Sequence, residues 1–216
     1  MLSRLNRLVQ LVSTVKVSLA AGEATQGNGS VDTASPASRR SHQTISLPDD
    51  GSGVINLAFG SCYGIFSHTS DIFETIAEER PDLFVWLGDV AYVDNPRHFG
   101  PMPPDYIHER FELTKNAAGY SKLLERSKVI GVWDDHDFGT NDGGKNFPFR
   151  DQNREFWLDF IDEPSDSERR TQRGSPIHQD YIIKKGEQVI QVILLDNRYE
   201  ADVDSSGASG DYLGAE

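Results

Sequence analysis

The 216-residue chain is long enough to bury one sizeable core, and its 37% hydrophobic and 25% charged residues are typical of a globular domain rather than a membrane or disordered chain. No apolar run approaches the roughly 20 residues that a transmembrane segment needs. The formal net charge of −13 argues against a surface for nucleic acid polymers, and it would repel a phosphate-bearing substrate unless bound cations offset it locally.

The N-terminal region differs in composition from the rest of the chain. Residues 1–22 hold basic but no acidic side chains and a mildly apolar stretch, which suits a signal or targeting segment. We expect a secreted or extracytoplasmic protein; because polar residues interrupt the apolar stretch, mitochondrial and cytoplasmic locations stay open. Residues 23–50 are rich in Gly, Ser, Thr, Ala and Pro and predict a flexible linker, so the folded domain is expected over 51–216.

Strands and helices alternate along residues 51–216, which predicts an α/β fold. Apolar runs with turn signals predict strands at 54–59, 83–87 and 129–133 and a hairpin formed by 181–183 and 189–195. Apolar residues at helical spacing predict helices over 71–80, from about 105, after 119 and over 150–161. Residues 95–104 and 165–176 are predicted loops.

Polar residues follow four of these apolar strands directly. They are Cys62, Asp89, the acidic cluster 134–137, and the segment 196–198. In an open α/β sheet the site forms outside the carboxyl ends of the strands, so these residues are expected to share one rim. A rim with a thiol, an imidazole and several carboxylates is self-repelling unless it holds cations.

Asp89 and Asp135 are the best ligand candidates at this rim, because each closely follows a buried strand. The alternative is that such aspartates cap the next helix. Capping needs only one acid, however, whereas residues 134–137 contain three. His136 has three open roles, as a ligand, as a proton donor to the leaving group, or as a phosphate contact.

Cys62 and Tyr92 are weaker candidates when taken alone. A lone cysteine is more often a small buried hydrophobic residue. A phenol with a pKa of about 10 would need a highly charged metal to ionise, and Tyr92 is otherwise a core or surface residue. The neighbouring polar residues are candidates for substrate contact or for support of the ligands, and they are Asp134, Asp137, Asn141, Asp142 and Arg198.

Four segments in this order resemble the PhoD-like alkaline phosphatase and phosphodiesterase family, within the calcineurin-like metallophosphatases. They are FGSC (59–62), LGDVAYVD (87–94), WDDHDFGTND (133–142) and LLDNR (194–198). The resemblance covers roughly residues 54–216. It implies a four-layer α/β/β/α sandwich, a small phosphate-ester substrate and a centre that contains Fe(III) and Ca²⁺, with other divalent cations also compatible.

The resemblance also assigns roles to individual residues. It implies that Cys62 as thiolate, Asp89 as bridging carboxylate and Tyr92 as phenolate hold the iron, since such ligands suit Fe(III) better than Mg²⁺. Asp135 and His136 stand where related enzymes have the Asn and His of a GNH[DE] signature. Metal ions would then polarise the phosphoryl oxygens and supply a hydroxide, while His136 stabilises or protonates the leaving group.

The sequence departs from the family in one respect. Family members carry a downstream Gly-Asp-Val-His-like segment that completes the metal site, and none follows Asp196 here. We therefore expect the C-terminal part of the sandwich to be missing and the hydrolase to be incomplete in this chain. The alternative function is a catalytically inactive cation-binding or interaction domain derived from the same fold. The oligomeric state is left open.

Overall fold

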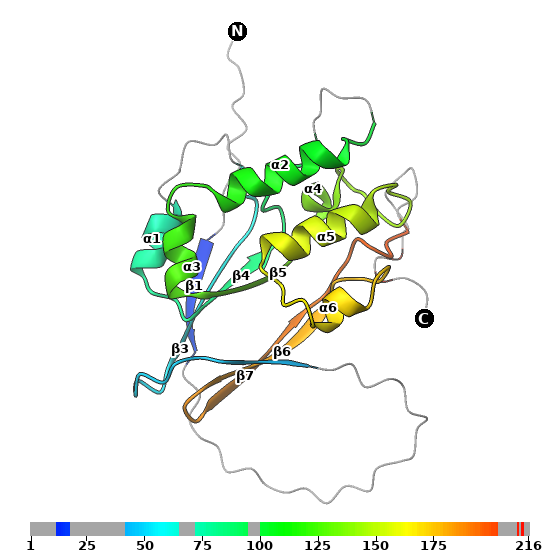
Figure 1. The fold of residues 1–216 in the computed structure, drawn as a ribbon. Coiled ribbons are helices and arrows are strands. Elements are labelled where there is room, and N and C mark those ends of the chain that lie inside the picture. The colour runs from blue at the N-terminus through cyan, green and yellow to red at the C-terminus, as the bar shows by residue number, and fades with distance from the viewer. Residues whose placement is uncertain are drawn as a thin grey trace, which may run out of the picture.

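A computed structural model describes residues 12–17, 42–64, 72–94, 100–202, 211 and 213 (Figure 1). The larger of its two sheets has four strands in the order β1-β3-β4-β5, which are β1 (Val12–Val17), β3 (Ile55–Gly60), β4 (Leu83–Leu87) and β5 (Lys128–Val132). The strands β3, β4 and β5 run parallel, so their carboxyl ends lie at one edge. Strand β1 runs antiparallel to β3.

The smaller sheet has three strands in the order β2-β6-β7, which are β2 (Gln43–Ser46), β6 (Gln179–Lys185) and β7 (Gln188–Leu194). Strands β6 and β7 form the predicted antiparallel hairpin, closed by Gly186 and Glu187. Strand β2 runs parallel to β6.

Helices cover one face of the four-stranded sheet (Figure 1). The described helices are α1 (Ile72–Glu78), α2 (Pro104–Lys115), α3 (Tyr120–Arg126), α4 (Asp135–Phe138), α5 (Arg150–Phe160) and α6 (Glu168–Thr171). The indole of Trp86 on β4 contacts Phe73 of α1, Tyr120 of α3 and Phe160 of α5, with ring centroids 5.9, 6.3 and 6.3 Å away. Aromatic packing on this one strand therefore joins three helices to the sheet.

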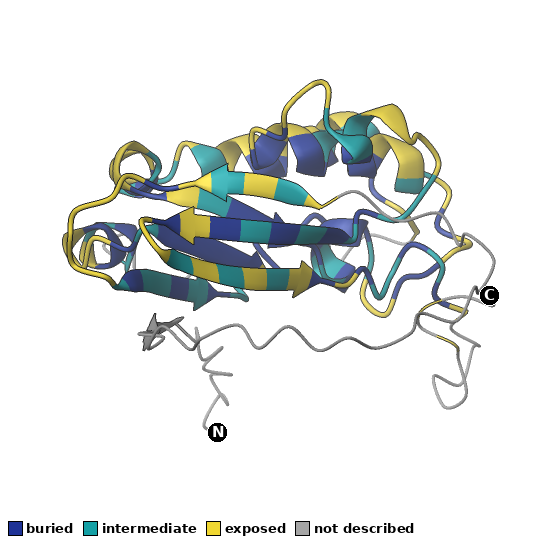
Figure 2. Ribbon diagram, turned by 90° about the horizontal axis from the view of Figure 1, so that it is seen from below, coloured by how far each residue is buried: buried dark blue, intermediate teal, exposed yellow. Residues whose placement is uncertain are grey.

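The smaller sheet lies on the side away from α1, α2 and α5, and α6 lies beside it (Figures 1 and 2). Its inner residues, such as Tyr181 and Ile183, belong to the same hydrophobic core as β4. The guanidinium of Arg169 donates to the carbonyl oxygen of Gly131 on β5 and lies 5.7 Å from the ring of Tyr181 on β6. The described part thus has one helical layer and two sheets. The α/β class is confirmed, and the four-layer sandwich is not.

Several elements lie outside the bounds expected from the sequence. Strand β2 lies inside 23–50, the expected linker, because residues 43–46 pair with β6; a four-residue strand carries little periodic signal of its own. Helix α6 lies inside the expected loop 165–176, where Ser167 caps it by accepting from the N–H of Arg170. Strand β1 lies within 1–22. The rest of that segment, residues 18–41 and residue 71 lie outside the described residues, so the targeting segment stays a prediction.

The described helices include none with the length and apolarity needed to cross a membrane.

Candidate metal centre

The turns that follow β3 and β4 bring Cys62 and Asp89 together at the carboxyl edge of the sheet. Both residues have left-handed backbones, with φ of 58° and 55°. The N–H of Cys62 donates to the carbonyl oxygen of Gly88 at 3.2 Å, and the N–H of Tyr63 donates to that of Asp89 at 2.7 Å. Gly88 has φ of 99°, and a Cβ atom there would lie 2.4 Å from the Cβ of Asp134. Only glycine therefore allows the β4 and β5 turns to meet.

Asp89 is the buried centre of this group, with 8% of its surface exposed. Its Oδ2 accepts from the thiol of Cys62 at 3.6 Å and from the hydroxyl of Tyr92 at 3.4 Å. Its Oδ1 is buried and has no hydrogen-bond partner. Burial, together with the charges of Asp135 and Asp134, raises the pKa of Asp89. A buried carboxylate oxygen without a donor is the condition that a bound cation relieves.

Asp135 and His136 approach Asp89 from helix α4, which begins directly after β5. Ligand atoms of Asp89, Asp135 and His136 all lie within 4.8 Å of one another. One carboxylate oxygen of Asp135 is fixed, because its Oδ2 accepts from the N–H of Asp142 at 2.7 Å. The three side chains thus have the spacing of a metal-ligand group.

His136 is oriented by Asp94. This residue ends the segment LGDVAYVD, but it was not among the predicted site residues. The Nδ1 atom of His136 lies 2.9 Å from both carboxylate oxygens of Asp94. Since a carboxylate only accepts, Nδ1 carries a proton and Nε2 is left for a ligand or substrate. Burial lowers the pKa of His136, but the hydrogen bond and charge of Asp94, with Asp89 and Asp135, outweigh it and raise the pKa to about 9.

The loop that carries Asp94 is tied to α4 at further points. The N–H of Val93 donates to the carbonyl oxygen of His136 at 3.2 Å, and the N–H of Asn141 donates to Asp94 at 3.1 Å. The rings of Tyr92 and His136 have centroids 4.3 Å apart. Asp94 therefore connects the turn after β4 with the segment after α4.

The surroundings of Cys62 and Tyr92 favour the protonated form of both side chains. Burial and the charge of Asp89 raise the pKa of the Cys62 thiol. Burial, then Asp89 and Cys62, raise the pKa of Tyr92 well above its usual value. A thiolate and a phenolate at these positions would need a strongly charged cation beside them, and the donor set of thiol, phenol, carboxylate and imidazole fits such an ion.

The remaining predicted residues divide into structural and exposed positions. Asp137 is fully buried and accepts from the N–H of Ala91 at 2.8 Å and from that of Asp134 at 3.3 Å, so it shapes the turns. Asn141 and Asp142 are exposed beside the rim, and the amide of Asn141 donates to Asp142 at 2.5 Å.

Arg198 reaches the rim from the segment after β7. Its Nε donates to Asp134 at 2.6 Å, and its Nη2 lies 3.9 Å from the carboxylate of Asp135. The segment is fixed by Asp196, which accepts from the indole N–H of Trp133 at 2.8 Å and from the N–H of Arg198 at 2.9 Å. Asp196 is thus an anchor, and it places one guanidinium at the edge of the acidic group.

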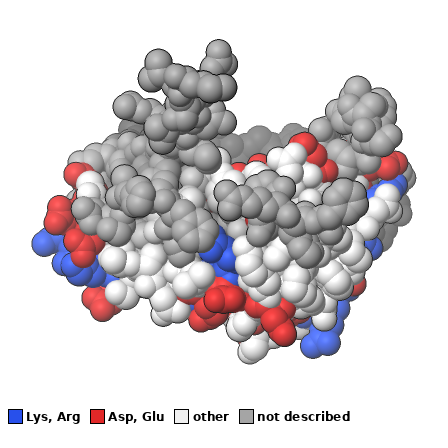
Figure 3. All heavy atoms as spheres, turned by 90° about the horizontal axis from the view of Figure 1, so that it is seen from above, with Lys and Arg blue, Asp and Glu red and all other residues white. Residues whose placement is uncertain are grey.

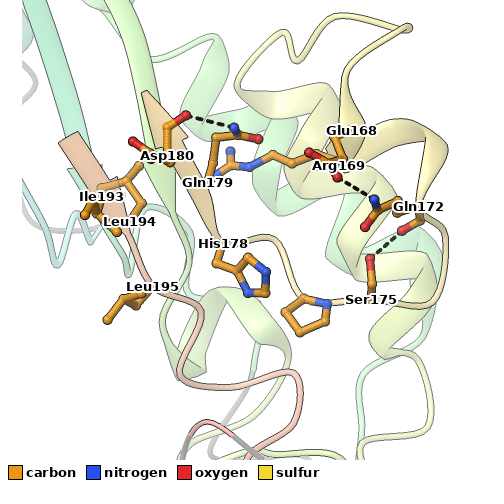
Figure 4. Close-up of a pocket in the computed structure, with 11 residues that line it drawn as sticks. Glu168, Arg169, Gln172, Ser175, His178, Gln179, Asp180, Ile193, Leu194 and Leu195 are labelled. Carbon is orange, nitrogen blue, oxygen red and sulfur yellow. Dashed lines mark hydrogen bonds between the residues drawn. The ribbon is translucent and has the colours of Figure 1, made fainter. Parts of the chain in front are cut away.

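A separate pocket of about 220 Å³ lies between α6 and the ends of β6 and β7 (Figure 4). Its lining residues include His178, Gln172, Ser175 and Leu195, and none of the rim residues contributes to it. On the face shown in Figure 3, described basic side chains stand beside acidic ones and form no broad basic patch.

Comparisons with known proteins bear on the fold. No family model matches the chain, and no curated protein matches its sequence. A solved structure titled "Structure of PhoD" is similar, with a TM-score of 0.54 and 16% identity over 70% of this chain and 33% of that chain. The chain thus spans about a third of that structure, and a likeness at this identity concerns the fold alone. The chain has an α/β fold like that of the PhoD structure, with an Asp-Asp-His group at its carboxyl edge.

Proposed function

We propose that this chain carries part of the active site of a metal-dependent phosphoric-ester hydrolase of the alkaline phosphatase and phosphodiesterase type. The observation that carries the proposal is the buried Oδ1 of Asp89, which has no hydrogen-bond partner although Asp135 and His136 offer ligand atoms within 4.8 Å. An isolated buried carboxylate is costly, so this arrangement is best explained by a cation that binds there.

The proposed metal ligands are Cys62, Asp89, Tyr92 and Asp135. Cys62 and Tyr92 flank one oxygen of Asp89, which supports Fe(III) beside a harder cation such as Ca²⁺. When bound, such ions polarise phosphoryl oxygens and lower the pKa of water. Asp89 would hold both ions, because its Oδ1 has no hydrogen-bond partner and its Oδ2 faces the thiol of Cys62 and the phenol of Tyr92.

His136 and Arg198 would act on the substrate side of this group. Asp94 holds the imidazole of His136 in one orientation and favours its protonated form. A protonated His136 can give the Nε2 proton to a leaving oxygen, or it can offer that nitrogen as a ligand after the proton is lost. The guanidinium of Arg198 is held at 2.6 Å by Asp134 and provides positive charge next to the acidic rim, where a phosphate must approach.

The experiment is metal analysis combined with hydrolysis of nitrophenyl phosphate and bis-nitrophenyl phosphate. Protein prepared with Fe(III) and Ca²⁺ should bind metal in a defined ratio, and His136→Ala should lower any turnover by about 10²-fold or more. His108→Ala is the matched control, because His108 lies on α2, is half exposed and pairs only with Glu112, at 3.9 Å, among the described ion pairs.

The results separate the proposal from its alternative. Bound metal together with turnover that depends on His136 supports the hydrolase. Bound metal without turnover, both in this chain and in a longer chain that includes the expected C-terminal part, supports the alternative, a catalytically inactive cation-binding or interaction domain. Absence of bound metal would overturn the hydrolase and the cation-binding form of the alternative, and it would leave Asp89 and Asp135 as residues that shape the turns.

A further inference from the structure

The segment 89–94 follows β4 and carries three side chains of the candidate metal centre, those of Asp89, Tyr92 and Asp94. Its first residue, Asp89, has a left-handed backbone with φ of 55°. A residue other than glycine keeps such a conformation only where its surroundings hold it, and such positions are common at functional sites. The contacts that hold this segment therefore determine where its ligand side chains lie.

Helix α4 holds the segment through its N–H groups. The carboxylate of Asp137, which is fully buried, accepts from the N–H of Ala91 at 2.8 Å, and the N–H of Asp89 is a further donor to it. The carbonyl oxygen of His136 accepts from the N–H of Val93 at 3.2 Å. Three alternate N–H groups of the segment are therefore bound by α4.

Helix α2 holds the same segment through the carbonyl oxygens that lie between those N–H groups. The hydroxyl of Thr114 donates to the carbonyl oxygen of Val90 at 3.1 Å. The Nε atom of Arg110 donates to the carbonyl oxygen of Tyr92 at 3.2 Å. Because Arg110 and Thr114 are four residues apart on α2, they lie on one face of the helix. This face is thus matched to two alternate carbonyl groups of the segment.

Both of these side chains are buried on a helix that is itself packed in place. Thr114 is 1% exposed and Arg110 is 5% exposed. Between them on α2, the ring of Phe111 packs against Trp157 of α5, with centroids 6.1 Å apart. Val90 is fully buried, so its carbonyl oxygen cannot turn to water when the Thr114 hydroxyl is removed. Loss of that hydroxyl must leave the oxygen unpaired or shift the segment.

We propose that Arg110 and Thr114 of α2 are positioning residues of the metal centre. By holding the backbone of the segment, they set where the Asp89 carboxylate and the Tyr92 phenol meet the metal ion. The segment cannot rotate about its own axis without breaking its contacts to α2 or to α4, so the Tyr92 hydroxyl stays 3.4 Å from Asp89. The inference rests on the proposed function in one respect, since it takes Asp89 and Tyr92 as metal ligands.

The test compares Thr114→Val, which removes the hydroxyl and nearly keeps the shape, with Thr114→Ser, which keeps the hydroxyl and removes the methyl group. In chelator, the amides of Ala91 and Val93 should exchange hydrogen about tenfold faster in Thr114→Val than in the wild type. Its affinity for Ca²⁺ by calorimetric titration should fall about tenfold. Thr114→Ser should stay close to the wild type in both measurements. A residue that only fills space would show the opposite order.

Thr171→Val is the matched control. The hydroxyl of Thr171 donates to the carbonyl oxygen of Ser167, one turn back in the chain, at 3.1 Å. The hydroxyl of Thr114 has the same contact with the carbonyl oxygen of Arg110, at 3.3 Å, but Thr171 is exposed and lies on α6. Thr171→Val should therefore leave both measurements unchanged.

Arg110→Lys is a second, independent variant. It keeps the charge and loses the fixed direction of the Nε–H of the guanidinium, so the affinity for Ca²⁺ should again fall about tenfold.

The outcomes separate this inference from the proposed function. A wild type that binds Ca²⁺, with Thr114→Val and Arg110→Lys that bind it equally well, would overturn the inference alone. Equal exchange of the Ala91 and Val93 amides in the wild type and Thr114→Val would also overturn it, whether or not metal binds. A wild type that binds no metal would overturn the proposed function, and with it the role of both residues in metal binding.

Discussion

The two ends of the four-stranded sheet carry charge in opposite ways. At the amino end, Asp82 accepts from the N–H of Asn56 at 2.7 Å and from the ammonium of Lys185 at 2.9 Å. Lys185 comes from the smaller sheet, its side chain is 2% exposed, and it also pairs with Asp50 at 3.0 Å. Asp82, Asp50 and Lys185 thus neutralise one another at this end.

The carboxyl end has the opposite balance. Asp89, Asp135 and Asp137 are all buried there. Arg198 makes its short hydrogen bond to Asp134, and Arg110 donates to the backbone carbonyl oxygen of Tyr92. One oxygen of Asp89 is left without a donor. The amino end therefore joins the two sheets through pairs made within the chain, whereas the carboxyl end is where the proposed cation would bind.

The largest effect is expected at the carboxyl end, from Asp89→Asn. We expect this variant to lose bound metal and any hydrolysis by at least about 10²-fold, because removal of even a supporting residue costs about 10–100-fold in metal affinity. In chelator the same variant should be as stable as the wild type or more stable. Burial raises the pKa of Asp89, so its ionised form destabilises the metal-free fold above the carboxyl's ordinary pKa, and asparagine removes that charge.

Metal content and urea unfolding with chelator check both parts of this prediction. If Asp89→Asn kept its metal and lost about 1 kcal/mol of stability, Asp89 would be a residue that caps a turn, and the contrast between the two ends would fail.

The next largest effect is expected at the amino end, from Asp82→Ala. Removal of one partner leaves the buried ammonium of Lys185 with Asp50 alone, and the free energy of unfolding should fall by about 3 kcal/mol. The double variant Asp82→Ala with Lys185→Met should recover much of this loss, since it removes the stranded charge. Metal content should not change. A decrease in bound metal would show that the two ends are coupled.

Sequence patterns predicted the strands and their polar ends because those signals are local. Residues 83–87 form β4 as predicted, since a continuous apolar run between turn residues suits a strand buried on both faces. The meeting of Cys62, Asp89 and Asp135 follows from parallel strands that end at the same edge. The family resemblance, rather than spacing, made Cys62 and Tyr92 ligand candidates.

Contacts that depend on tertiary packing could not be predicted in this way. Lys185 meets Asp82 across 103 residues, and nothing in either local sequence indicates a buried pair. Asp94 lies 42 residues before His136, and its role depends on how the loop after β4 folds over α4. Its position at the end of LGDVAYVD was the signal that could have identified it.

Asp94→Asn should have an intermediate effect that is confined to the carboxyl end. The variant loses the charge that favours protonated His136, and activity should fall about 10–100-fold while metal stays bound. In the presence of a chelator, the pairing of His136 with Asp94 should stabilise the fold fully at a pH below 6.5, the ordinary pKa of histidine. Because the pKa of His136 in the folded protein is raised to about 9, this stabilisation is lost as the pH rises through that value.

Urea unfolding between pH 6 and 10 measures this dependence. The wild type should lose roughly 2 kcal/mol more than Asp94→Asn across that range. Asn141→Ala is the control, because the backbone N–H of Asn141, which binds Asp94, is kept. Equal slopes for the wild type and Asp94→Asn would contradict the assigned pair.

The smallest effect is expected from Asp50→Asn, which tests which carboxylate holds Lys185. Hydrogen bonds from Ser52, then Lys185, lower the pKa of Asp50, so its contribution is present above the ordinary value of 3.8 and is lost as the pH falls. Because Asp50 is exposed and Asp82 still pairs with Lys185, the loss at pH 7 should be well below that of Asp82→Ala. Urea unfolding at neutral and acidic pH should show the difference from wild type closing in acid. An effect as large as that of Asp82→Ala would show that Asp50, rather than Asp82, is the main partner of Lys185.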